Sequence, residues 1–254
     1  MSFTPLVSYE GANSGRGLSP GLWAKQPRDF QDFNVGFGFE DDFGSFGLSE
    51  SGGAADGSDV TVASDWLLTN ATAGTAALDP AAKGGVLLLD SASSTNNQGA
   101  QIQYGGSVAA ASFVPSANAK IYFETRIKLA DIGSTTVQFF AGLAIVEAEV
   151  IASAANATAN HIGYEAINTT ALGIHSEKAG SRSSTASAHT IVADTYVKIG
   201  FVVDGLSKVT PYVNGEAKTA ITTNVPIVGL TPTFVCRSSG TTDPILHIDW
   251  VACY

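Results

Sequence analysis

The sequence of 254 residues contains little charge, little sulfur and no long apolar segment. Charged residues make up 14% of the chain, well below the roughly 25% of an ordinary soluble domain. No apolar run approaches the ~20 residues that a membrane-spanning helix needs, so we expect no membrane partner. The two cysteines are too few for a disulfide framework or a zinc knuckle. These absences exclude disulfide scaffolds, zinc modules and helical membrane proteins.

Basic residues are also scarce. The chain has 13 Lys and Arg against 23 Asp and Glu, a net charge of −10. Nucleic-acid-binding proteins need a basic surface to replace the counterions of the phosphates, so we expect no nucleic-acid partner. The opening residues 1–5 lack the charged region and apolar run of a signal peptide. We therefore expect synthesis in a cytoplasm, with release by lysis rather than secretion.

What the sequence does contain is a series of short strand patterns separated by turns. In the segment 196–216, two strands are followed by the turn pairs Asp204-Gly205 and Asn214-Gly215, which readily take φ > 0 in tight hairpins. In 120–129, a core-facing apolar row alternates with a polar row that should lie in water. Further strands are predicted at 86–90, 100–104, 137–148, 161–167, 172–177, 233–237 and 245–254. The sequence therefore predicts an all-β antiparallel sandwich with no helix.

The late strands carry two specific expectations. In 245–254, the alternation predicts that Leu246, Ile248 and Trp250 form one inward row. Cys236 and Cys253 lie in predicted strands, and we expect two buried thiols that act as small apolar groups. A disulfide between these two cysteines stays open as the alternative.

Residues 1–36 differ from the predicted domain at 37–254. Glycine and proline interrupt every regular period there, yet isolated aromatic side chains recur. One interpretation is an extended N-terminal arm that docks on a partner and orders there. The other is a strap over the chain's own domain, and both stay open. The candidate partner-binding residues are Phe3, Tyr9, Trp23, Phe30 and Phe33.

Five segments together carry a resemblance to a known family. They are Phe39-Glu40-Asp41-Asp42-Phe43, Ile121-Tyr122-Phe123-Glu124-Thr125-Arg126-Ile127, Tyr196-Val197-Lys198-Ile199-Gly200-Phe201, Tyr212-Val213-Asn214-Gly215 and His247-Ile248-Asp249-Trp250-Val251. In this order they resemble the concanavalin A-like, laminin-G-like jelly roll, in particular the versions found in virion proteins of tailed bacteriophages. The resemblance covers residues 37–254.

The resemblance implies a structural protein on the exterior of a virion. It would be a capsid decoration, or cement, protein that binds the major capsid protein of a phage head through its arm and self-associates there. The alternative that the resemblance leaves open is a carbohydrate-binding module of a phage tail or fibre, or a lectin-like adhesion protein. A host-surface glycan would then be the partner.

The laminarinase-type glucanases have the jelly-roll fold that this chain resembles, so their catalytic motif can be compared with the acids of this sequence. Those enzymes place three acids on one strand as Glu-x-Asp-x-x-Glu, because the acid/base and the nucleophile must line one face. The nearest match, Glu147-Ala148-Glu149, lacks the Asp and the third acid. The four histidines show no metal-ligand spacing. We therefore expect two solvated acids, no catalytic residues and no enzyme.

Two binding sites remain as hypotheses. Sugar binding needs an aromatic ring beside planar polar groups, and a hairpin of 161–167 with 172–177 would bring together His161, Tyr164 and His175. The laminin-G-like resemblance also implies that Ca²⁺ could bind, although solvated turn aspartates are the alternative. The candidate oxygen ligands are Asp41, Asp42, Asp56 and Asp59. No other cofactor or metal is expected.

Overall fold

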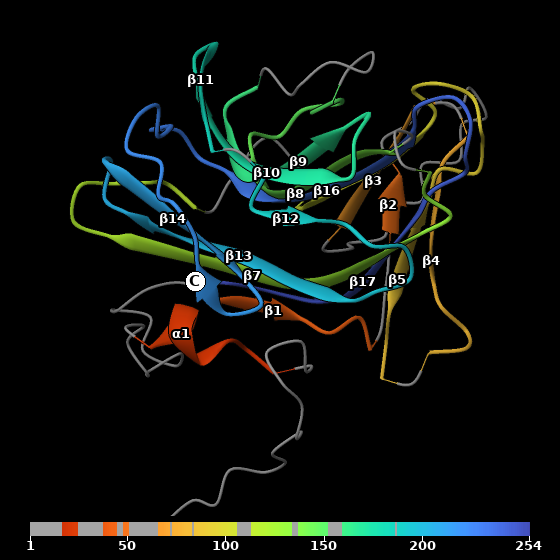
Figure 1. Cartoon of the computed structure of the whole chain (residues 1–254), viewed down its shortest axis with the longest axis horizontal. Helices are drawn as coiled ribbons and strands as arrows, with labels where there is room; N and C mark the ends of the chain where they lie inside the picture. Colours follow the sequence, from red (N-terminus) through yellow and green to blue (C-terminus); the bar gives the residue numbers. More distant parts are fainter. Residues whose placement is uncertain are drawn as a thin grey trace, which may run out of the picture.

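A computed structural model of the chain describes residues 17–24, 38–44, 48–50, 66–71, 73–82, 84–105, 113–133, 137–151, 159–185 and 187–254. Within these residues two β-sheets pack face to face, and a short helix lies against one of them (Figure 1). This architecture confirms the predicted all-β sandwich. Every described strand pair is antiparallel except β2 with β3.

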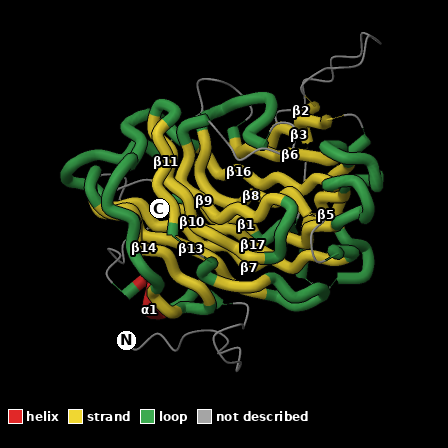
Figure 2. Tube along the Cα trace, turned by 45° about the horizontal axis from the view of Figure 1, so that its top comes forward, coloured by secondary structure: helices red, strands yellow, loops and turns green. Residues whose placement is uncertain are grey.

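The elements follow a two-sheet order. Helix α1 spans Pro20–Trp23. The first sheet contains, in spatial order, β15 (Glu216–Ala217), β14 (Lys208–Val213), β13 (Val197–Asp204), β7 (Lys120–Ala130), β17 (Ile245–Cys253), β5 (Leu87–Asp90) and β4 (Thr75–Leu78), with β1 (Phe39–Asp41) paired to β17. The second contains β11 (Ser181–Ser184), β10 (Ala171–Lys178), β9 (His161–Ile167), β8 (Val137–Ala144), β16 (Thr231–Ser238), β6 (Gly99–Tyr104), β3 (Trp66–Ala71) and β2 (Leu48–Glu50), with β12 (His189–Thr190) paired to β10. Figure 2 shows β11, β10, β9, β8 and β16 side by side across this second sheet.

The core lies between the two sheets and follows the predicted alternation. Ile121 and Phe123 of β7 are buried, and the Phe123 ring stacks on Phe201 of β13 at a centroid distance of 5.0 Å. Large rings of this kind contribute much of the apolar area that a sandwich buries. Cys236 and Cys253 are free and buried in the same core, which confirms the expected pair of thiols.

The predicted tight turn at Asn214-Gly215 is present. Asn214 has φ 49° and Gly215 has φ 80°, the left-handed values that a type I′ hairpin turn requires at both central residues. The turn joins β14 to β15, with Val213 paired to Glu216. The preceding hairpin, formed by β13 and β14, is not closed by a two-residue turn. Asp204 pairs with Lys208, so the residues between them form a longer connection.

The predicted inward row of the last strand is wrong at Trp250. The register of β17 against β7 shifts between Ile248 and Trp250, so that Trp250 pairs with Arg126. An inserted residue reverses the facing of all residues that follow it. Leu246 and Ile248 are buried in the core as predicted, and Val251 takes the inward place after the shift.

Part of the outer face of the first sheet is covered by residues 17–24, which we call the strap (Figure 1). Leu22 of the strap is 2% exposed and packs with Tyr122, and the Trp23 ring stacks on Tyr122 at 5.7 Å. The prediction that the polar row of 120–129 lies in water is therefore wrong at Tyr122 and Glu124, which are 2% and 1% exposed. The strap also contains α1, where the sequence predicted no helix. Pro20 suits its first turn because no intrahelical donor is needed there.

No helix in the described part of the chain is long and apolar enough to cross a membrane.

Candidate functional site

The hairpin of β9 and β10 exists as predicted, and it carries the candidate site on its outer face. The strand register pairs Gly163 with His175 and Glu165 with Gly173. Successive residues of a strand point to opposite faces. The side chains of β9 that belong to the core are Ile162, Tyr164 and Ala166. His161, Gly163 and Glu165 therefore face outward, away from the other sheet.

A buried ion pair anchors this outer face. Arg182 of β11 places Nη2 2.7 Å from Glu165 Oε2, and the Glu165 side chain is 1% exposed. A carboxylate taken out of water at this depth requires such a charged partner. The Arg182 Nε also donates to His175 Nδ1 at 3.0 Å. The guanidinium thus holds both an acid and an imidazole in place.

The hydrogen bond from Arg182 fixes the tautomer of His175. Because Nδ1 accepts a hydrogen bond, a neutral imidazole carries its proton on Nε2. Burial, together with the positive charge of Arg182, lowers the pKa of His175 to about 3. His175 is therefore neutral at physiological pH and offers one N–H donor at Nε2.

Glu165 and His175 open into a cavity of about 240 Å³, which we call the Glu165 cavity. It is lined by Glu165, Ile167, Thr169, Ala171, Gly173, His175, Thr185 and Ser187. A Cβ atom on Gly173 would lie 3.0 Å from His175 Nε2 and 3.3 Å from the Thr185 carbonyl oxygen. The absence of a side chain at Gly173 therefore lets the His175 ring and the Thr185 carbonyl lie close against β10 at the cavity.

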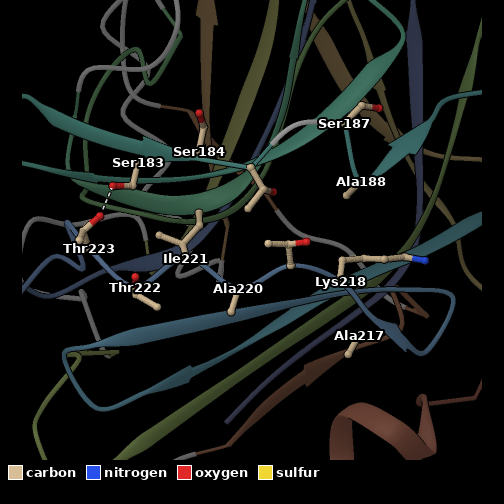
Figure 3. A pocket seen from close by; sticks show the side chains of 12 residues that line it. Ser183, Ser184, Ser187, Ala188, Ala217, Lys218, Ala220, Ile221, Thr222 and Thr223 are labelled. Carbon is tan, nitrogen blue, oxygen red and sulfur yellow. Dashed lines mark hydrogen bonds between the residues drawn. The ribbon is translucent and has the colours of Figure 1, made fainter.

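A second, larger cavity of about 900 Å³ lies between residues 183–185 and 187–188 on one side and residues 217–223 on the other (Figure 3). We call it the hydroxyl-lined cavity, because its described lining is mostly serine, threonine and alanine with Lys218. Ser183 and Thr223 point toward one another in Figure 3, with 2.6 Å between their hydroxyl oxygens. The two cavities share Thr185 and Ser187 as a common wall.

Of the three predicted sugar contacts, the structure brings only His175 to a cavity. His161 shares its face but is fully buried, with Nδ1 2.7 Å from the Ala159 carbonyl oxygen. Tyr164 points into the core and donates its hydroxyl to the Tyr212 carbonyl oxygen at 2.8 Å. Its prediction as a sugar contact is wrong, because a spacing of three residues along a strand puts Tyr164 on the face opposite His161.

The acids Glu147 and Glu149 lie beyond the end of β8, since the predicted strand 137–148 ends at Ala144. Glu147 donates its backbone N–H to Gln103 Oε1 at 3.0 Å. Glu149 Oε1 lies 3.3 Å from Arg237 Nη2, and its side chain is 46% exposed. The two acids are thus not placed on one strand face as a glucanase motif requires.

Four of the candidate partner-binding aromatics, Phe3, Tyr9, Phe30 and Phe33, lie outside the described residues. Trp23 lies in the strap, where its Nε1 donates to Glu124 Oε2 at 2.7 Å. For residues 17–24 the structure thus matches the alternative of a strap over the chain's own domain. The docking arm stays a prediction for the remainder of 1–36.

The candidate Ca²⁺ ligands are only partly described. Asp41 Oδ2 accepts a hydrogen bond from Trp66 Nε1 at 2.8 Å, and Asp42 Oδ1 accepts one from the Gly44 N–H at 3.1 Å. Asp56 and Asp59 lie outside the described residues. Within the described ranges no group of three His, Cys, Asp or Glu side chains is placed to hold a metal ion. Ca²⁺ binding stays a prediction.

Sequence reasoning missed Glu165, Arg182 and Gly173. One signal was available, because Glu165 is the one acidic residue in the predicted strand 161–167, and a charge in a buried strand requires a partner. The partner itself gave no local signal, since Arg182 lies on β11, two strands away.

No protein-family model matches the chain, and no curated protein matches its sequence. Solved structures do match its fold. A protein of unknown function from Shewanella oneidensis has 15% identity and a TM-score of 0.54, covering 85% of each chain. A GH16 glycoside hydrolase of Bacteroides ovatus has 14% identity and a TM-score of 0.52, covering 85% of this chain and 99% of that one. An endo-β-1,4-glucuronan lyase from the fungus Trichoderma reesei has 8% identity and a TM-score of 0.51, covering 73% and 89%.

These neighbours correct the expectation that the chain is no enzyme. Carbohydrate-cleaving enzymes are among the proteins that share its architecture, so the absence of a glucanase motif does not place the chain outside enzymes. At these identities the likeness establishes the fold alone. The described chain has the concanavalin A-like jelly-roll fold.

Proposed function

We propose that the chain binds carbohydrate in the Glu165 cavity. The observation that carries the proposal is the pairing of a donor with an acceptor at one cavity: the His175 Nε2–H beside the carboxylate of Glu165. A sugar hydroxyl donates one hydrogen bond and accepts others, so it suits a site that offers both. A carboxylate has about four lone-pair positions and can accept several hydrogen bonds at once.

The surroundings of the cavity support the same proposal. Arg182 fixes Glu165 and His175 from one side, and a site whose polar groups are already ordered loses less entropy on binding. Ile167 and Ala171 add apolar lining, which suits the C–H faces of a sugar ring. The fold supports it too, because carbohydrate-active proteins are among its neighbours.

The test is a glycan array probed with the purified full chain, followed by calorimetry on the glycans that bind. Gly173→Val should abolish binding, because its side chain would crowd His175 Nε2 and the Thr185 carbonyl oxygen and displace them in the cavity. The matched control is Thr222→Val in the hydroxyl-lined cavity, which should bind like the wild type. Loss of binding in Thr222→Val with retention in Gly173→Val would move the site to the other cavity.

A second candidate function is cleavage of a glycan at the same site. It is favoured by one observation, the buried carboxylate of Glu165 at a cavity, since carboxyl groups act as acid, base or nucleophile in glycoside hydrolysis. The test is incubation with mixed-linkage β-glucan and with β-1,4-glucuronan, with release of new chain ends as the readout. Activity that Glu165→Gln abolishes would favour cleavage, and no release from either polymer would leave binding as the function.

A structural role on a phage capsid, with the major capsid protein and further copies as partners, remains a prediction from the sequence. The proposed site fits the alternative of a carbohydrate-binding module on a tail or fibre. Electron microscopy of purified particles that carry the chain would distinguish a head position from a tail position.

A further inference from the structure

We infer that the Glu165 cavity takes the terminal, neutral sugar residue of a glycan and excludes the interior of a glycan chain. This inference rests on the proposed function and specifies its ligand. It follows from how the outer face of the second sheet is enclosed on both sides of the cavity.

One side is closed by residues 145–151, which we call the covering segment. Two glutamines of β6 tether its backbone to the outer face of the sheet. Gln103 Nε2 donates to the Ile145 carbonyl oxygen at 2.9 Å, and Gln101 Oε1 accepts from the Val150 N–H at 2.8 Å. Arg237 of β16 adds a hydrogen bond to the Ile151 carbonyl oxygen. These three hydrogen bonds, two buried and one partly buried, hold the covering segment on β6 and β16.

Apolar packing seals the covering segment against the sheet. Val150 and Ile151 are 2% and 0% exposed and form one cluster with Phe140 and Val235, and Ile167 packs against it. Ile167 also lines the Glu165 cavity. Among the described residues, the covered part of the sheet over β8 and β16 therefore borders the cavity on this side.

Phe140 closes the same side nearer to β9. A Cβ atom on Gly163 would lie 2.6 Å from Phe140 Cζ, so the ring lies directly over this glycine. The Phe140 ring also meets His161 edge to face at 5.4 Å. The part of β9 before Glu165 is thus covered, and a glycan chain could not extend along it.

The opposite side is closed by the segment after β11. The Thr185 N–H donates to the Ile174 carbonyl oxygen at 3.1 Å, and the Ala188 N–H donates to the Leu172 carbonyl oxygen at 2.7 Å. These bonds hold Thr185 and Ala188 along the edge of β10, where Thr185 and Ser187 form a wall of the cavity. The site is a pit between two walls.

The size and charge of the pit define which sugar it can hold. Its volume of about 240 Å³ is below the roughly 300–1,000 Å³ typical of pockets for drug-sized ligands, which suits one sugar ring. The charge of Arg182 is matched by Glu165, and His175 is neutral. An acidic sugar would bring a second carboxylate beside Glu165 without a second cation from the lining, and like charges in a buried site repel strongly.

The experiment uses the full chain on an array of glycans attached through their reducing ends. We expect that the bound glycans share one neutral terminal residue and differ in their internal sequence. Trimming that residue with an exoglycosidase should abolish binding. In calorimetry, the Kd of the methyl glycoside of that sugar should lie within about threefold of the Kd of its linear oligosaccharides, since contacts beyond the pit add little.

Three outcomes would overturn the inference. The bound glycans could share an internal repeat and differ at their ends, the affinity could rise steeply with each added unit, or glycans that end in an acidic sugar could bind best. In each case carbohydrate binding itself would stand. If the wild-type chain binds no glycan, the proposed function fails and this inference fails with it.

Discussion

Arg182 on β11 pairs with Glu165 on β9, although β10 lies between the two strands. The guanidinium therefore crosses the outer face of β10, and on its way it donates to His175. This crossing brings three polar side chains from three strands to one cavity. The stability of the site and its chemistry thus depend on one side chain.

The first prediction concerns this ion pair. Arg182→Met should lower the free energy of unfolding by about 3 kcal/mol, because it leaves the buried carboxylate of Glu165 without its cation. The double variant Arg182→Met/Glu165→Gln should recover part of this loss, which a double-mutant cycle in urea measures. Strictly additive effects would show that the pair does not couple.

The second prediction concerns pH. Burial lowers the pKa of His161 to about 4, below the ordinary value of about 6.5 in an unfolded chain. The unfolded state therefore binds more protons between these values, and the stabilisation is lost as the pH falls from 6.5 towards 4. The wild type should lose about 3 kcal/mol more than His161→Gln between pH 7 and pH 4. Parallel pH profiles for the two proteins would contradict the placement of His161.

The third prediction concerns the strap. Trp23→Phe keeps a ring on Tyr122 but removes the donor to the buried carboxylate of Glu124. It should cost about 1–3 kcal/mol, the penalty of a lost bond to a buried charged group. Leu18→Ala is the control, since Leu18 is 37% exposed and should change little. An unaltered melting temperature in Trp23→Phe would mean that the hydrogen bond from Trp23 to Glu124 does not stabilise the domain.

The fourth prediction concerns β17, which lies between β7 and β5 in the first sheet. Removal of residues 245–254 should prevent folding, because it splits that sheet. The milder change Ile248→Ala should cost about 2–5 kcal/mol by leaving a core cavity. Ile227→Ala offers a matched control at a position that is 54% exposed. Equal denaturation midpoints for the two alanine variants would show that β17 is misplaced.

Much of the fold could be predicted from the sequence because its causes are local. The alternation in 120–129 and 161–167 follows from the period of a strand, and Asn214-Gly215 follows from the φ values that these residues tolerate. The same period also places Tyr164 on the face opposite His161, so the sequence alone could have excluded Tyr164 as a sugar contact beside His161. The register shift beyond Ile248 was not predictable, since nothing in the local alternation marks the inserted residue.

The candidate site was harder to predict because its contacts join distant strands. His175 was identified from its hairpin, but the sequence does not show that Arg182 would cross β10 to reach Glu165. The position of the covering segment could not be predicted either, since Gln101 and Gln103 bind backbone atoms more than 40 residues away in sequence. Such pairings depend on the strand order, which the periodic pattern leaves undetermined.

The most direct test of the account is a crystal structure of the chain with a glycan identified on the array. We predict that one sugar ring occupies the Glu165 cavity, with one hydroxyl accepting from His175 Nε2 and another hydroxyl within hydrogen-bond distance of the Glu165 carboxylate. A glycan seated in the hydroxyl-lined cavity, or on the outer face of the first sheet, would contradict it.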